Sequence, residues 1–87
     1  MARKKYTDED KRLSKIFSER LKSERKSLDL SQDDLSKISN ISIDTIRSLE
    51  SGRIVAPSLF MANKIIQALN GDLSNWMSDI EREFKND

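Results

Sequence analysis

Two groups of neighbouring carboxylates are the residues with the most obvious chemistry in this 87-residue chain. Paired carboxylates can act as general acid and base; one group covers residues 8–10 and the other is Asp33-Asp34. Each group stands just after a hydroxyl residue, Thr7 or Ser31. A hydroxyl followed by acids is typical of a helix start, because the hydroxyl caps free N–H groups and the acids favour the positive end of the helix dipole. We therefore interpret both groups as helix caps and not as a catalytic pair.

The composition excludes several classes of site. The chain contains neither His nor Cys, which removes disulfides, thiolate and imidazole metal ligands, and catalysis built on either residue. The sequence therefore predicts no enzyme, no metal, no cofactor and no small-molecule substrate. The longest apolar run, residues 59–62, is far too short to span a membrane, and we expect a cytoplasmic protein.

The charge is distributed unevenly along the chain. Residues 1–26 hold ten Lys/Arg and five Asp/Glu, whereas residues 27–87 hold six and ten, so that a basic end is hidden in a net charge of +1. Basic ends commonly approach phosphate backbones. Residues 1–7, with Arg3, Lys4 and Lys5, are expected to form a flexible basic arm. The alternative is a solvated tail without a partner.

The apolar residues follow a helical period nearly throughout, and no segment alternates with period two. The sequence therefore predicts an all-α fold, with helices that begin at residues 8, 31, 42, 57 and 72 within a single domain of residues 8–87. Asp29 and Gly52 are expected to be left-handed residues where helices end. The predicted core comprises Leu13, Ile16, Phe17, Leu21, Leu35, Ile38, Ile41, Ile46, Leu49, Leu59, Ala62, Ile65, Ile66, Leu69, Leu73, Trp76 and Met77.

Two short helices within residues 31–51, joined by a tight turn, have the spacing of a helix-turn-helix. Their apolar side chains would pack inwards and leave Ile43, Asp44, Arg47 and Ser48 on the outer face of the second helix. Such a helix can enter the major groove of DNA, which is about 12 Å wide. An ordinary helical hairpin inside a bundle is the alternative explanation of the same pattern.

Several motifs occur in a characteristic order: Leu30-Ser31-Gln32, Ile41-Ser42-Ile43, Leu49-Glu50-Ser51-Gly52-Arg53 and Pro57-Ser58-Leu59. With them, residues 21–73 resemble the helix-turn-helix domain of the lambda-repressor and Cro type, the Xre family. The resemblance implies a compact five-helix, lambda-repressor-like fold that binds double-stranded DNA in a sequence-specific manner.

The resemblance also assigns roles to individual residues. Ile43, Asp44 and Ser48 match its base-reading positions, and Arg47, on the same outer face, is expected to contact bases with them. Contacts to the DNA backbone are expected from Gln32, Ser42, Thr45 and Arg53, with Arg3, Lys4 and Lys5 of the arm. Ile43 and Asp44 depart from the polar or basic residues usual in the family, so the carboxylate of Asp44 either specifies a base or repels the phosphates. Arg25 and Glu50 match a structural salt bridge of the family and receive no base contact.

The C-terminal helix, residues 73–84, extends beyond the usual family core. Ile80 and Phe84, with Phe60 or Met61, are expected to form an apolar dimer surface; the alternative is simply a longer core helix. Together these features predict a homodimeric repressor on a near-palindromic operator, located at the nucleoid when bound to DNA. The rival prediction is a protein-interaction module whose Ile43-Asp44 surface binds a toxin or a cognate regulator. RNA binding is the weakest alternative, because no aromatic stacking platform is evident.

Overall fold

The computed structural model describes residues 6–86 and contains five helices within them. They are α1 (Asp8–Ser27), α2 (Gln32–Ser39), α3 (Ile43–Glu50), α4 (Leu59–Ala68) and α5 (Leu73–Lys85). The described part of the chain contains no strand. The predicted all-α class and the order of the helices are confirmed.

Each helix begins at a side chain that accepts a hydrogen bond from a backbone N–H three residues further on. These caps are Thr7, Ser31, Ser42, Ser58 and Asp72. At the first two caps the carboxylate of the third helical residue, Asp10 or Asp34, accepts a hydrogen bond from the backbone N–H of the cap, which completes a capping box. Asp10 and Asp34, one from each acidic group, thus act in helix capping.

Residues in the left-handed conformation follow the first four helices. Asp29 and Gly52 have φ of 61° and 80°, as the sequence predicted, and Asn40 and Asn70 adopt the same region. After α3, the N–H of Gly52 donates to the carbonyl of Leu49 and the N–H of Arg53 to that of Ser48. Gly52 can adopt this positive φ because it has no side chain. The positive φ turns the chain so that these two bonds form, and they end α3.

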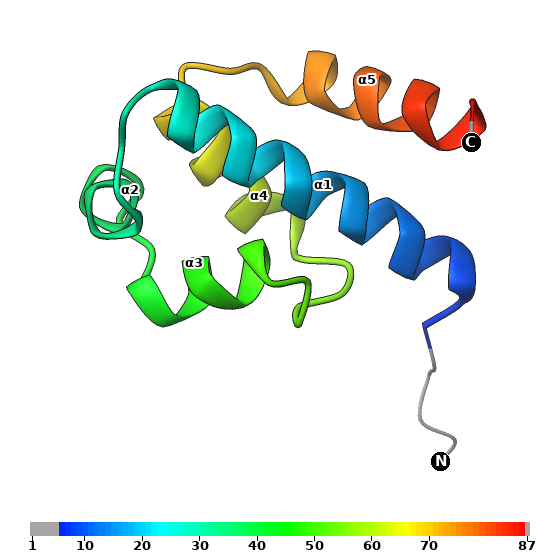
Figure 1. The fold of residues 1–87 in the computed structure, drawn as a ribbon, viewed down its shortest axis with the longest axis horizontal. Helices are drawn as coiled ribbons and strands as arrows, with labels where there is room; N and C mark the ends of the chain where they lie inside the picture. Colours follow the sequence, from blue (N-terminus) through cyan, green and yellow to red (C-terminus); the bar gives the residue numbers. More distant parts are fainter. Residues whose placement is uncertain (1–5, 87) are drawn as a thin grey trace.

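Helix α1 is the central element. It lies between α5 on one side and α3 on the other, and α2 and α3 pack together at one end of the molecule (Figure 1). Helix α4 contacts both α2 and α5 and closes the core. Helix α3 therefore lies at an edge of the fold, with one side towards the core.

The core is built from apolar side chains of all five helices. Its buried members are Ile16, Phe17, Leu21, Leu35, Ile46, Leu49, Ala62, Ile65, Ile66, Leu69, Trp76 and Ile80. Trp76 packs at 5.9 Å from the Phe17 ring, and the Arg20 guanidinium lies 4.8 Å from the centre of the indole. Arg20 also donates to Asp79 at 2.8 Å, so this residue joins α1 to α5 through both an aromatic and a carboxylate contact.

Several assignments of exposure from the sequence are wrong. Ile38, Leu59 and Met77 are exposed, although they were expected in the core. Helix α2 instead buries Leu35 and the small residue Ser39, whose hydroxyl donates to the Leu35 carbonyl, and this turns Ile38 outwards.

The reverse error concerns the C-terminal helix. Ile80 was expected on the dimer surface, but it is only 3% exposed and lies in the core. Phe84 is half-buried beneath Arg12, whose guanidinium lies 4.5 Å from the ring centre, and Met61 packs partly against the core. Leu59 and Met77 instead line an apolar groove of about 310 Å³ between α1, α4 and α5. Phe60, 82% exposed, is the only residue of the expected dimer surface that is fully open to solvent.

Candidate nucleic-acid interface

The position of α3 follows from its own sequence. Ile46 and Leu49 are fully buried and fix one side of the helix against the core. The opposite side carries the exposed side chains of Asp44 and Arg47, and Ser48 lies half-buried beside them. The pattern of period 3.6 thus leaves Asp44, Arg47 and Ser48 along the outer side of an eight-residue helix. We call these three residues the outward strip of α3.

Ile43 stands at the start of this strip and is half-buried. The preceding cap, Ser42, accepts from the N–H of Thr45 at 3.2 Å and donates its own hydroxyl to Thr45 Oγ1 at 2.8 Å. Both hydroxyls therefore lie at the N-terminus of α3, where free N–H groups and the helix dipole favour an anion.

The charge on the outer side of α3 is balanced. Arg47 Nη1 lies 3.7 Å from Asp44 Oδ1, and the Asp44 side chain is 92% exposed. Arg47 is the only cation of the helix, so the attraction of α3 for phosphates is small.

Arg53 lies at the opposite end of α3. Its Nε donates to Ser51 Oγ and its Nη2 to Ser48 Oγ, both at 3.2 Å. These two bonds occupy two of the five N–H groups of the guanidinium. The remaining groups stay exposed beside the C-terminal turn of α3.

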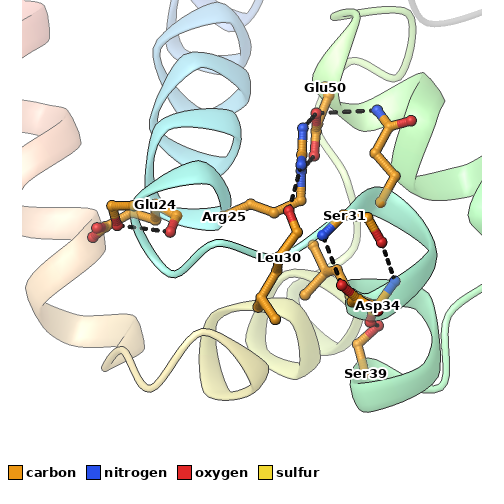
Figure 2. Close-up of polar contacts among 10 residues, drawn as sticks. Glu24, Arg25, Leu30, Ser31, Asp34, Ser39 and Glu50 are labelled. Carbon is orange, nitrogen blue, oxygen red and sulfur yellow. Dashed lines mark hydrogen bonds and ion pairs between the residues drawn. The ribbon is translucent and has the colours of Figure 1, made fainter.

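A buried ion pair joins α1 to the end of α3 (Figure 2). Arg25 Nε donates to Glu50 Oε2 at 2.6 Å and Nη2 donates to Oε1 at 2.9 Å, a bidentate geometry. A third bond runs from Arg25 Nη1 to the carbonyl of Leu30 at 2.7 Å. The side chains of Arg25 and Glu50 are only 9% and 3% exposed. One guanidinium therefore connects α1, the residues before α2 and the last residue of α3.

Gln32, the first residue of α2, joins the same network. Its side-chain amide donates to Glu50 Oε1 at 3.1 Å, and the residue is half-buried. The amide has a second N–H, and the N-terminus of α2 presents free backbone N–H groups beside it.

The protonation of this network follows from its contacts. Burial by itself raises the pKa of Glu50, but hydrogen bonds from Arg25 and Gln32, together with the charges of Arg25 and Lys22, bring the pKa below its ordinary value. The hydrogen bond to Glu50 raises the pKa of Arg25 against the opposing effect of burial. At the nearby cap, hydrogen bonds from the backbone and side chain of Ser31 lower the pKa of Asp34. All three groups are therefore charged at neutral pH.

One hydrogen bond that anchors the site was not predicted from the sequence. The buried hydroxyl of Ser14 in α1 accepts from the N–H of Ala56 at 2.9 Å and fixes the loop that follows α3. Ala56 has a φ of 55°, which is unfavourable for a residue with a Cβ. No local signal could have identified this bond, because its partners lie 42 residues apart and neither is unusual in its own segment.

Three predicted contacts of the DNA backbone cannot be placed in the structure. Arg3, Lys4 and Lys5 of the arm lie outside the described residues.

Across residues 6–86, no group of three or more acidic side chains is arranged to hold a metal ion. Within the same range, every helix is too short or too polar to cross a lipid bilayer.

The short α2, the turn at residues 40–42 and the outward strip of α3 define a helix-turn-helix, the class of domain that presents its second helix to DNA. The profile of a Helix-turn-helix family matches residues 21–76, which is more than half of the chain. The chain belongs to this family, the Xre or lambda-repressor type, whose members are DNA-binding regulators. No curated protein and no solved structure matches the chain significantly.

Proposed function

We propose that the protein is a sequence-specific regulator of transcription that reads double-stranded DNA with α3. The observation that carries the proposal is the outward strip of this helix: Asp44 and Arg47 are exposed while Ile46 and Leu49 anchor the helix in the core. An exposed polar strip on a rigidly seated helix is what base reading in the major groove requires.

Each residue of the outward strip, and Ile43 at its start, has a matching base chemistry. The methyl groups of Ile43 suit the thymine methyl, the carboxylate of Asp44 can accept from the cytosine amino group, and Arg47 can donate to guanine. Ser48 is proposed as an additional base contact. Gln32, Ser42, Thr45 and Arg53 are proposed to contact phosphates, because they surround the N-terminus of α2 and both ends of α3.

We further propose a homodimeric repressor acting on a near-palindromic operator. One eight-residue helix reads only a few base pairs, and two copies related by a two-fold axis read two half-sites about one helical turn apart. We propose that the copies contact each other through the apolar side chains of Leu59, Phe60 and Met77, since these side chains remain exposed when the domain is folded. Occupation of the operator would then block polymerase.

Sedimentation tests the dimer. Phe60→Ser is expected to convert a dimer to a monomer at micromolar concentration, whereas Ile38→Ser, the same type of change at an exposed apolar residue of α2, is expected to leave the dimer intact. A wild-type protein that sediments as a monomer with its operator bound would contradict the proposal.

Selection of bound sequences from a random duplex pool tests sequence specificity. Enrichment of two inverted half-sites about one helical turn apart is the expected result. Arg47→Ala is expected to relax the preference at one position of each half-site, at about 1–3 kcal/mol for a lost bidentate contact. A pool without an enriched motif would contradict sequence-specific reading.

A second candidate function has its own supporting observation. The most exposed charge on α3 is an acid, Asp44, and it lies beside the only cation of that helix. This balance favours a protein partner, such as a toxin or a cognate regulator, more than a phosphate backbone. Salt-dependent binding to a duplex of arbitrary sequence separates the two, because an interaction module without DNA affinity shows none.

A further inference from the structure

Helix α1 carries four exposed lysines on one side: Lys11, Lys15, Lys22 and Lys26. At 3.6 residues per turn they fall within an arc of about 60°. The rise of 1.5 Å per residue makes this row about 22 Å long. We refer to these four residues as the lysine stripe.

The cations of α1 differ in what they contact. Arg20 pairs with Glu24 and Asp79, and Arg25 pairs with Glu50, so these two arginines bind the helix to the rest of the fold. Among the described residues, by contrast, no side chain of the lysine stripe makes an ion pair or a hydrogen bond. The stripe is therefore not explained by the stability of the domain.

The stripe lies next to the side of α1 that faces the helix-turn-helix. That side is fixed by two contacts, from Arg25 to Glu50 at the end of α3 and from Ser14 to Ala56 in the following loop. On the helical wheel, Ser14 and Arg25 lie about 40–120° from the members of the stripe. Lys22 is close enough to Glu50 that its charge lowers the pKa of this carboxyl. The lysine stripe is thus on the part of the α1 surface that borders α3.

The acids near the stripe are few. Asp8 falls in the same arc at the N-terminal end of α1, where the helix dipole accounts for it. Glu19 lies just outside the arc of the stripe, and among the described residues no ion pair joins it to Lys15 or Lys22. The arc between Lys11 and Lys26 is therefore predominantly positive.

We infer that the lysine stripe binds the phosphate backbone of the DNA strand that borders the groove occupied by α3. The inference rests on the proposed function, and it names the source of the electrostatic attraction that α3 itself lacks. Phosphates of one strand are about 3.4 Å apart along the duplex axis, so a row about 22 Å long can follow several of them. Flexible ammonium groups suit this role, because each needs only to approach a phosphate as a point charge.

The test compares two variants of equal charge. Lys15→Gln with Lys22→Gln removes two members of the stripe, and Lys64→Gln with Lys85→Gln removes two exposed lysines of α4 and α5. Binding to a labelled duplex of about two helical turns is measured by fluorescence anisotropy between ~50 and ~200 mM salt. Thermal unfolding verifies that the variants are folded.

Each phosphate contact contributes about 0.9 to the slope of log affinity against log salt concentration. The stripe variant is expected to lose about 1.8 from this slope and up to about 60-fold in affinity at ~0.1 M salt. The control variant is expected to keep the wild-type slope, and Lys15→Arg with Lys22→Arg is expected to retain it as well.

The outcomes separate the inference from the proposed function. If the wild type binds DNA and the stripe variant keeps its slope, or if the control variant loses as much, the inference is overturned while the proposed function stands. If the wild type binds no duplex even at the lowest salt concentration, the proposed function fails first.

Discussion

Replacing Arg25 with Met is expected to destabilise the domain strongly. The substitution keeps an apolar stem of similar length but removes all three hydrogen bonds of the guanidinium, two to Glu50 and one to the Leu30 carbonyl. The carboxylate of Glu50 then stays buried, with Gln32 as its remaining donor. Removal of one partner from a buried pair costs about 3–5 kcal/mol. A domain of this length has a free energy of unfolding of about 4–13 kcal/mol, so the loss is a large part of the total.

Urea denaturation followed by circular dichroism measures the effect. Arg20→Met is the matched control, because Arg20 also lies in α1 and also binds a carboxylate on another helix, but its side chain and that of Asp79 are 29% and 39% exposed. Solvent screens such a pair, and we expect a much smaller loss. A second variant, Arg25→Met with Glu50→Leu, removes the stranded charge and should recover most of the lost stability.

The same variants differ in pH dependence. In the wild type the pKa of Glu50 lies below its ordinary value of 4.5. The contribution of the pair is therefore complete above pH 4.5 and is lost as the pH falls through the lower, folded pKa. In Arg25→Met, burial without the guanidinium raises the pKa of Glu50, so the folded state takes up a proton first. The deficit in stability should then shrink as the pH falls from neutral towards 4.5.

Two results would refute this account of the pair. The first is a loss for Arg25→Met no larger than that for Arg20→Met. The second is a double variant as unstable as Arg25→Met alone, since the stranded charge on Glu50 would then not be the cause of the loss.

Three further predictions concern single positions. Gly71→Ala should destabilise the domain by about 1–3 kcal/mol in urea denaturation, because a Cβ there would lie 2.5 Å from Trp76 Nε1; an unchanged midpoint would show that the indole moves freely. Ala56→Gly should stabilise by up to about 1 kcal/mol in thermal unfolding, because glycine tolerates the φ of 55°; a lower melting temperature would argue against strain at this residue. Asp44→Asn should strengthen binding to arbitrary duplex at low salt by removing repulsion from phosphates; weaker binding in anisotropy would show that the carboxylate itself makes a contact.

The boundaries of the helices were predictable because the signals that fix them are local. Ser31 and Asp34 are three residues apart and form a capping box in any chain that begins a helix there. Gly52 ends α3 through a positive φ that other residues adopt with difficulty. Such features depend on neighbours in the sequence, so the five helices could be placed before any packing was known.

The rotation of each helix about its axis was less predictable. Ile38 and Ser39 both fall near the inner side of α2, and only the packing of that helix decides that the small polar residue is buried and the large apolar one exposed. The case of α5 is different, because its apolar residues fall within one arc of about 100°, with Ile80 inside the arc and Met77 at its edge. The pattern itself therefore places Ile80 towards the core and Met77 towards the surface. Hydrophobic period alone does not resolve the case of α2, because eight residues make only about two turns.

Helix α1 combines two tasks that the chain divides between its arginines and lysines. Arginine presents a planar fork that satisfies a carboxylate with two bonds, which suits the nearly buried contact from Arg25 to Glu50. Lysine keeps a strongly hydrated charge, and a row of lysines therefore remains in solvent until phosphates replace the water. Because Arg25 and Ser14 fix α1 against α3 and its loop, the spacing between the lysine stripe and the outward strip of α3 is set by the fold. Binding of both to one duplex then requires no rearrangement of the domain, and the charge that α3 lacks is supplied from a neighbouring helix at a fixed position.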